Sequence, residues 1–202
     1  MFDFSPSSVL PFDGEAIYYG KIFNENESAF YLDQLLQTIE WKQDEIILFG
    51  KRIITSRKVA WYGENQIDYT YSNVTKTAMP FTSELLNLKA ITEQYTGGKY
   101  NTCLLNLYHN GNEGMSWHSD DEKMIVENSS IASLSFGAQR VFKFKHKKNN
   151  TIFKLILENG SLLDMKGETQ KHWLHALPKS KSIQSIRINL TFRNTLFADS
   201  NN

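Results

Sequence analysis

The chain has 202 residues, 41% of them hydrophobic, and its 22 lysines and arginines balance its 22 aspartates and glutamates. This length and apolar content suffice for one sizeable core, so a single domain is expected. Zero net charge excludes a protein that binds a polyanion through its overall charge, and any affinity for nucleic acid must be local. A lone cysteine, Cys103, cannot form an intramolecular disulfide, and no stretch is suited to span a bilayer. We therefore expect a reducing, cytoplasmic setting without membrane contact.

Two amphipathic helices are predicted in the first half of the chain, after an irregular stretch of about twenty residues. The first is expected to run from Asn26 to Trp41. Its inner side is predicted to consist of Phe30, Leu35, Leu36 and Ile39. The second is expected from Ser83 to Tyr95, because Thr82 or Ser83 can cap its start and Gly97-Gly98 can end it.

A hairpin is predicted between these helices, where the apolar runs 46–48 and 53–55 flank Phe49-Gly50-Lys51-Arg52. Aromatic and basic side chains are interleaved around it, which is what base stacking beside phosphate contacts requires. They are Phe49, Lys51, Arg52, Arg57, Lys58, Trp61, Tyr62, Tyr69 and Tyr71. A second basic cluster consists of Lys143, Lys145, His146, Lys147 and Lys148. Such charges are commonly a solvated face, and Phe49 could also be a core aromatic of the hairpin.

Short strands interrupted by glycines dominate the chain from Thr102 onward, a pattern typical of a jelly roll. The segment from Ile186 to Arg193 alternates apolar and polar residues and predicts a strand with two different faces. Its polar face consists of Arg187, Asn189, Thr191 and Arg193, and a neighbouring strand presents Asn106 and Tyr108. Side chains of these types would suit an anion with several oxygens, such as a dicarboxylate. The alternative is a half-exposed strand that faces water.

His118 and Asp120 are candidate metal ligands, because residues two apart in an extended segment point the same way. His175 would complete the set. Two histidines and one carboxylate leave coordination positions open, as in non-heme Fe(II) oxygenases, whereas structural zinc sites are closed by four ligands. A His-x-Asp spacing alone is more often a surface turn, so the assignment depends on the polar strands beside it.

From about Leu10 to Arg193 the chain resembles the AlkB family of Fe(II)- and 2-oxoglutarate-dependent nucleic-acid dealkylases. The resemblance lies in Asn106-Leu107-Tyr108, His118-Ser119-Asp120-Asp121-Glu122, Ile131–Gly137, His172–Pro178 and Arg187–Arg193. Leu48-Phe49-Gly50-Lys51 and Tyr69-Thr70-Tyr71-Ser72 are similar to the branch that acts on duplex DNA.

The resemblance implies an α+β double-stranded β-helix, a jelly-roll barrel with the amino-terminal helices packed on the outer sheet face and a substrate-gripping hairpin. Residues 1–202 would form one dioxygenase domain. Within it, about 10–100 would carry the helices and the nucleotide-recognition hairpins, and about 101–195 the catalytic barrel.

The activity implied by the resemblance is oxidative demethylation of N-alkylated bases in DNA, such as 1-methyladenine and 3-methylcytosine, which releases formaldehyde, succinate and CO2. His118, Asp120 and His175 would hold Fe(II) at the catalytic centre, with 2-oxoglutarate and O2 as co-substrates and ascorbate as a candidate stimulant. The residues implied to bind 2-oxoglutarate or to line its site are Asn106, Tyr108, Arg187, Asn189, Thr191 and Arg193. Arg187 is the candidate for the distal carboxylate, because its planar fork can bind two oxygens at once.

The residues implied to contact the substrate are Phe49, Gly50, Lys51, Arg57, Tyr69, Thr70, Tyr71, Asp121 and Glu122. A base must leave the duplex to reach a buried metal, so Phe49 is the candidate wedge, and Tyr71 and His118 would enclose the base. Asp121 and Glu122 would attract a cationic methylated base, unless they are solvated loop acids.

The expected partner is alkylated DNA, duplex, single-stranded or both, and the expected state is a monomer in the cytoplasm of a bacterium rather than in a nucleus. Two alternatives stay open. One is the same chemistry on RNA or on a protein, and the other is a non-catalytic nucleic-acid-binding module with a vestigial site.

Overall fold

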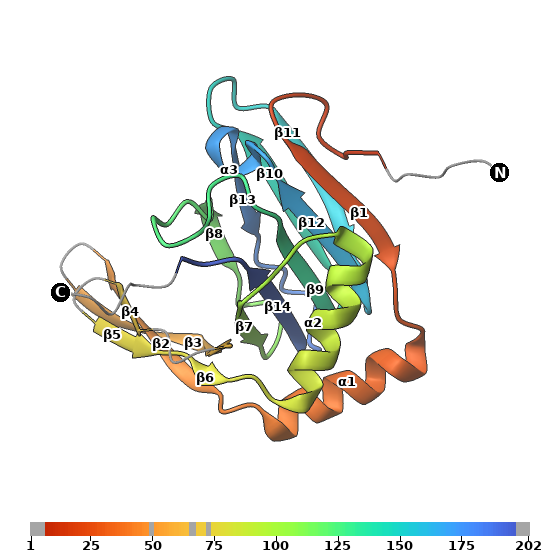
Figure 1. Cartoon of the computed structure of the whole chain (residues 1–202), viewed down its shortest axis with the longest axis vertical. Helices are drawn as coiled ribbons and strands as arrows, with labels where there is room; N and C mark the ends of the chain where they lie inside the picture. Colours follow the sequence, from red (N-terminus) through yellow and green to blue (C-terminus); the bar gives the residue numbers. More distant parts are fainter. Residues whose placement is uncertain (1–6, 49–50, 65–67, 72–73, 197–202) are drawn as a thin grey trace.

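Two β-sheets form the body of the protein in a computed structural model, which describes residues 7–48, 51–64, 68–71 and 74–196 (Figure 1). The larger sheet contains β1 (Glu15–Lys21), β2 (Lys42–Leu48), β3 (Lys51–Gly63), β6 (Met79–Pro80), β7 (Thr102–Tyr108), β9 (Ile131–Gly137), β12 (Ser161–Lys166) and β14 (Arg187–Arg193). The smaller sheet contains β8 (Met115–His118), β10 (Arg140–His146), β11 (Ile152–Leu157) and β13 (Trp173–Leu177). A separate hairpin pairs β4 (Asp68–Tyr71) with β5 (Val74–Thr77).

The strand order is β1-β12-β9-β14-β7-β3-β2 in the larger sheet, with β6 beside β3, and β11-β10-β13-β8 in the smaller one. Apart from the parallel pair β3 and β6, the pairings between described strands are antiparallel. This mostly antiparallel architecture is consistent with the predicted jelly roll. The described strands form two separate sheets with a pocket between them, so within the described residues this jelly roll is not a closed barrel.

Two long helices, α1 (Glu25–Thr38) and α2 (Ser83–Thr96), pack against the larger sheet, as predicted. A capping box between Asn24 and Glu27 starts α1, and Thr82 caps α2, which ends at Gly97 in the left-handed conformation with φ 69°. The third helix, α3 (Thr169–His172), is a single turn before β13.

The inner side of α1 differs from the prediction at one position. Phe30 is 56% exposed, whereas the buried stripe consists of Tyr31, Leu35 and Ile39. These three residues recur at intervals of four, so they lie one above another on one side of the helix. Tyr31 packs edge-on against the buried ring of Phe23, and this contact places Phe30 towards solvent. Within the described residues, no helix is long and apolar enough to cross a membrane.

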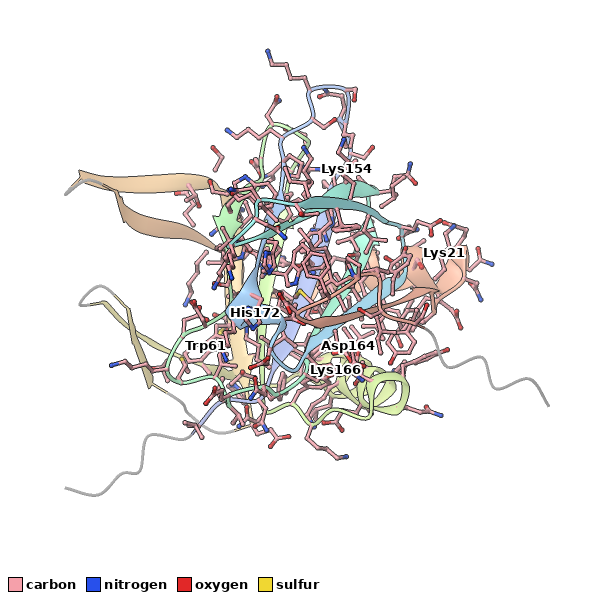
Figure 2. The ribbon with its side chains drawn as sticks, turned by 90° about the horizontal axis from the view of Figure 1, so that it is seen from above. Lys21, Trp61, Lys154, Asp164, Lys166 and His172 are labelled. Atoms are coloured by element: carbon pink, nitrogen blue, oxygen red, sulfur yellow. The ribbon has the colours of Figure 1, made fainter. Side chains whose placement is uncertain are left out.

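The hairpin of β2 and β3 pairs as predicted and extends the larger sheet. Figures 1 and 2 both show that this hairpin and the β4–β5 hairpin project from the same side of the molecule. Of the predicted tip Phe49-Gly50-Lys51-Arg52, the first two residues lie outside the described residues, whereas Lys51 and Arg52 belong to β3 and pair with Leu48 and Ile47.

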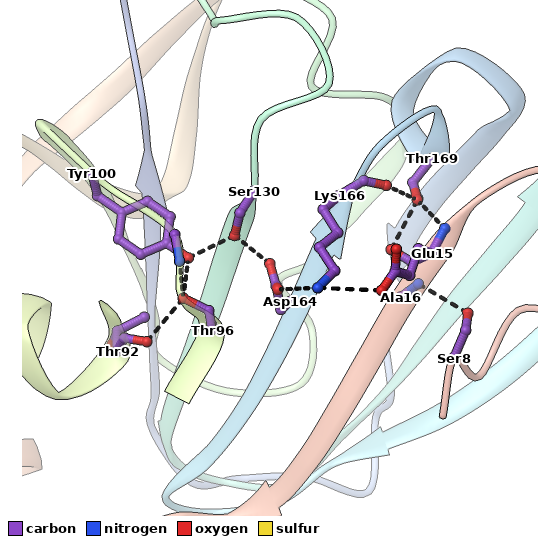
Figure 3. A network of polar contacts seen from close by, with 11 residues as sticks. Ser8, Glu15, Ala16, Thr92, Thr96, Tyr100, Ser130, Asp164, Lys166 and Thr169 are labelled. Carbon is purple, nitrogen blue, oxygen red and sulfur yellow. Dashed lines mark hydrogen bonds and ion pairs between the residues drawn. The ribbon is translucent and has the colours of Figure 1, made fainter. Parts of the chain in front are cut away.

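A polar network connects α2 to the larger sheet on one side of the core (Figure 3). The Tyr100 hydroxyl lies 2.7 Å from Thr96 Oγ1 and 2.6 Å from Ser130 Oγ, and Ser130 donates to the Asp164 carboxylate on β12. Asp164 is fully buried, and its other oxygen, Oδ2, lies 4.0 Å from Lys166 Nζ. Burial raises the pKa of Asp164, and the Ser130 hydrogen bond and Lys166 offset only part of that effect.

The raised pKa of Asp164 predicts how stability depends on pH. A folded state that binds a proton more tightly than the unfolded chain gains stability at low pH and loses it as pH rises through the folded pKa. An asparagine at this position cannot titrate. The free energy of unfolding of Asp164→Asn minus that of wild type should therefore be largest at neutral pH and should decrease towards pH 4. Urea unfolding of both proteins between pH 4 and 8 measures this difference, and a difference that is constant with pH would contradict the prediction.

Candidate active site

The pocket between the two sheets is lined by side chains from both of them. The larger sheet contributes Leu104, Asn106, Tyr108, Ser133, Met165, Arg187, Asn189 and Arg193. The smaller sheet and the loop after β8 contribute Met115, His118, Asp120, Phe142, His175 and Leu177. Antiparallel pairing brings these distant residues together, since β13 lies between β10 and β8, and β14 lies between β7 and β9.

His118, Asp120 and His175 converge in this pocket. One potential ligand atom from each lies within 4.8 Å of the other two. His118 and His175 are directly opposite in the β8–β13 register, and their ring centroids are 4.2 Å apart. The Nδ1 of His118 donates to the Ser116 carbonyl at 2.8 Å, which leaves Nε2 with a free lone pair. Side-chain exposure of 36% makes His118 the solvent-facing member.

The Asp120 carboxylate is buried and is held by a cation. Arg193 Nη2 lies 2.8 Å from its Oδ1. Burial raises the pKa of Asp120, but Arg193 and the two histidines outweigh that effect and bring the pKa to about 2. The backbone N–H of Asp120 donates to Gln170 Oε1 at 2.9 Å, which fixes the loop that presents the carboxylate. Asp120 is thus ionised at neutral pH, as a metal ligand must be.

His175 is kept neutral by its surroundings. It is 5% exposed, and the ring of Phe142 stacks on it with centroids 5.5 Å apart. Burial lowers the pKa of His175 to about 3, although Asp120 opposes that effect. A neutral imidazole beside an ionised carboxylate and a second imidazole matches the donor set expected for Fe(II) with open positions.

Arg187 is a buried cation without a carboxylate partner among the described residues. It is 2% exposed, and its Nη2 donates to Ser135 Oγ at 2.9 Å. Its Nε has no hydrogen-bond partner within the described part of the chain, and its guanidinium carbon lies 5.5 Å from the centroid of the Tyr108 ring. Burial lowers the pKa of Arg187 to about 10. An isolated buried charge is unfavourable, so this arginine fits the binding of an anionic ligand in the pocket.

The other residues predicted for the 2-oxoglutarate site occupy the same strands with different partners. Asn189 donates to Ser133 Oγ at 2.8 Å, and Thr191 Oγ1 donates to Asn189 Oδ1 at 3.3 Å. Asn106 is buried, and its Oδ1 has no hydrogen-bond partner among the described residues. Three residues that line this pocket beside the potential ligands, Asn106, Arg187 and Arg193, thus each have a buried polar atom without a hydrogen-bond partner in the described part of the chain.

Three of the predicted substrate residues have described side chains. Arg57 Nη1 lies 3.5 Å from Met115 Sδ, which places β3 against the rim of the pocket. Asp121 is exposed and accepts from Ser119 Oγ at 2.9 Å. Glu122 is not a solvated loop acid: burial raises its pKa against the opposing charge of Arg193. The remaining predicted contacts, Phe49, Gly50 and the side chains of Lys51, Tyr69, Thr70 and Tyr71, lie outside the described parts.

Sequence reasoning missed several residues that hold the site together. Lys147 was assigned to a basic surface cluster, but its Nζ donates to Ser119 Oγ at 2.9 Å and to the Gln170 carbonyl at 2.8 Å. Lys147 and Gln170 therefore anchor the loop that carries Asp120. Trp117 was also missed; its ring is 37% exposed, with Lys145 Nζ 5.1 Å from its centroid.

Comparisons with known proteins agree with this geometry. A family model described as the 2OG-Fe(II) oxygenase superfamily matches residues 15–193. The alpha-ketoglutarate-dependent dioxygenase alkB homolog 3 of Homo sapiens is 38% identical over 191 residues, which cover 90% of this chain and 66% of that protein. The DNA oxidative demethylase ALKBH2 of Mus musculus is 34% identical over 195 residues, which cover 91% of this chain and 82% of that protein. The solved structure of OsALKBH1 has a TM-score of 0.61 at 14% identity, covers 89% of this chain and 97% of its own, and shows the fold.

The family match defines the class of protein as a 2OG-Fe(II) oxygenase, for which Fe(II), 2-oxoglutarate and O2 are implied, as predicted. Within this class the chain belongs to the AlkB family, because relatives with 34% and 38% identity align along nearly its whole length. It spans just under two thirds of the length of the human alkB homolog 3.

The unpaired charge of Arg187 predicts opposite effects on stability and on ligand binding. Arg187→Met removes a buried cation, so it should leave stability without ligand unchanged or raise it by about 1–4 kcal/mol. The same change should abolish the rise in melting temperature that 2-oxoglutarate produces with Mn(II) in place of Fe(II). Thermal unfolding with and without the co-substrate measures both effects.

Arg140→Met is the matched control. Arg140 is also buried, but its Nη2 donates to the carbonyls of Glu113 and Pro178, both at 2.8 Å. Losing this donor should destabilise the protein by about 1–3 kcal/mol for each orphaned carbonyl. If Arg187→Met were equally destabilising, Arg187 would be a structural residue and not a ligand-binding one.

Proposed function

We propose that this protein is an Fe(II)- and 2-oxoglutarate-dependent dioxygenase that removes alkyl groups from ring nitrogens of nucleic-acid bases, with alkylated DNA as its substrate. The observation that carries the proposal is the pairing, in one pocket, of an open His-Asp-His cluster with a buried arginine that lacks a carboxylate partner among the described residues. The cluster suits the metal, and Arg187 suits the distal carboxylate of the co-substrate.

The residues of the chain would act by binding, orienting and excluding water. His118, Asp120 and His175 would hold Fe(II), and Arg193 would keep the carboxylate of Asp120 ionised and fixed. Fe(II) held there would supply the oxidising chemistry with 2-oxoglutarate and O2, in which one oxygen atom would enter succinate as CO2 leaves and the other would convert N–CH3 to N–CH2OH. The hydroxymethyl product releases formaldehyde and restores N–H without an acid or base from the protein. Positioning the alkyl carbon is therefore the main task of the pocket.

Residues next to His118 in the chain are consistent with a nucleic-acid substrate. Trp117, which precedes His118 in the chain and is 37% exposed, forms a cation–aromatic pair with Lys145. Aromatic faces stack on bases and cations contact phosphates, so this pair suits the strand next to an extruded base. The name of one relative, DNA oxidative demethylase, points to DNA as the polymer.

Formaldehyde release from oligonucleotides that carry 1-methyladenine or 3-methylcytosine tests the proposed activity. Single-stranded DNA, duplex DNA and RNA of one sequence should be compared with Fe(II) and 2-oxoglutarate present. We expect turnover on DNA that requires both, and inhibition by Co(II) and Ni(II), which bind N/O sites more tightly than Fe(II). Full activity in a chelator would overturn the proposal, and turnover on RNA alone would move the substrate to RNA.

Duplex and single-stranded DNA are distinguished by Phe49, which we propose as the wedge that fills the gap left by the flipped base. Flipping a base out of a duplex costs on the order of a few kcal/mol of stacking and pairing free energy, whereas flipping a base in a single strand costs little. Phe49→Ala should therefore slow repair of the duplex far more than repair of the single strand. Trp117→Ala is the comparison variant, and it should raise KM on both substrates because stacking beside the site does not depend on a second strand. Equal losses on both substrates for Phe49→Ala would count against the wedge.

A further inference from the structure

A second cluster of potential ligands lies outside the pocket described above. Asp13, His146 and His172 each offer one ligand atom, and these atoms lie within 4.8 Å of one another. The three residues come from the segment before β1, from the last position of β10 and from the end of α3, and His172 is labelled in Figure 2. We propose that they bind a divalent transition-metal ion of the Zn(II) type.

The spacing of the donors suits one ion. His146 Nε2 and Asp13 Oδ2 are 3.2 Å apart. Two donors bound at 2.0–2.1 Å to a tetrahedral ion are separated by about 3.3 Å, so this pair is already at coordination distance. Glu168 adds a further carboxylate oxygen 3.5 Å from His172 Nε2. Two imidazoles and a carboxylate, with water in a fourth position, form a set that Zn(II) and its neighbours in the first transition row prefer to Mg(II) or Ca(II).

A buried, unpartnered nitrogen points to a missing ligand. His146 is 3% exposed, and its Nε2 has no hydrogen-bond partner among the described residues, although the Asp13 carboxylate lies close by. Buried polar atoms are nearly always hydrogen-bonded, so an orphan of this kind needs an explanation. A cation between His146, Asp13 and His172 would satisfy the nitrogen and neutralise the carboxylate.

Metal binding would change the tautomer of His146. Its Nδ1 accepts a hydrogen bond from the backbone N–H of Asn149, at 3.3 Å, so the neutral ring carries its proton on Nε2. An ion on Nε2 requires the proton to move to Nδ1, which displaces this contact. The contact is longer than the usual 2.9–3.0 Å and so is weak. The proton shift is a signature that a simple His–Asp contact would not produce.

The surroundings of the cluster are already ordered. The His146 ring lies nearly parallel to that of His172, with an interplanar angle of 11°, and packs against Phe12 and Trp173. Trp173 Nε1 donates to the Phe12 carbonyl at 3.1 Å, and Asp13 adopts a left-handed backbone with φ 49°. A non-glycine residue in this conformation is uncommon, and such conformations concentrate at functional sites.

The second ion would stiffen the strands that carry the first site. On β10 and β13, His175 is opposite Phe144 and Trp173 is opposite His146. His172 and His175 are three residues apart, which corresponds to about 10 Å along an extended chain, too far to share one ion. An ion at the second cluster would tie residues 12 and 13 to the end of the strand pair that positions His175.

Zn(II) binding in a His118→Ala background tests the proposal, because that change weakens binding at the first site. Metal content after dialysis and competition with a chromophoric chelator give the stoichiometry. We expect His118→Ala to retain one equivalent, and the added change His172→Gln or Asp13→Asn to remove it. Both residues are partly exposed at the surface, so the variants should fold, and a thermal melt in chelator checks this. The control is His109→Gln, since His109 is a half-exposed histidine outside both clusters. This variant should keep one equivalent of Zn(II).

The tautomer gives a second, independent readout. In the His118→Ala protein, ¹H–¹⁵N correlation spectra of the imidazoles should show the His146 proton move from Nε2 to Nδ1 when Zn(II) is added. Equal Zn(II) content with and without His172→Gln, or an unchanged His146 tautomer at saturation, would overturn the proposal. Neither readout depends on catalytic activity.

Discussion

The pocket depends above all on the buried ion pair between Arg193 and Asp120, whose Nη2 and Oδ1 lie 2.8 Å apart. Burying two charges is unfavourable unless each finds a close partner. Arg193 ends β14 in the larger sheet and Asp120 follows β8 in the smaller one, so the pair connects the two sheets beside the histidines. Because Arg193 and the two histidines together outweigh the effect of burial on the pKa of Asp120, the carboxylate stays ionised and ready to act as a ligand.

A single strand in the middle of the larger sheet organises the chemistry around this pair. β14 is hydrogen-bonded to β7 on one side and to β9 on the other, so its backbone is fixed along its whole length. Ile188, Leu190 and Phe192 are completely buried in the core beneath the helices, whereas Arg187, Asn189 and Arg193 line the pocket. This strand presents two cations. Arg193 is neutralised by Asp120, whereas Arg187 has no carboxylate partner among the described residues. Of these two arginines, Arg187 is therefore the one suited to bind an anionic ligand.

The loop that carries Asp120 is held by side chains from elsewhere in the chain. Gln170 accepts the Asp120 backbone N–H, and Lys147 connects Ser119 to the Gln170 carbonyl. These contacts fix the position of the Asp120 carboxylate, whereas His118 on the same segment is 36% exposed.

The sequence by itself determined the two long helices, the alternating strand at 187–193 and the candidate ligands His118, Asp120 and His175, because these signals are local periodicities and short motifs. It did not determine that Tyr31, and not Phe30, faces the sheet, that the strands form two sheets and not a closed barrel, or that Lys147 supports a loop. Nor did it bring Asp13 to His146 and His172, which are more than a hundred residues further along the chain. Those outcomes were decided by the tertiary structure, since burial, orphaned polar atoms and ion pairs depend on which distant segments the sheets place side by side.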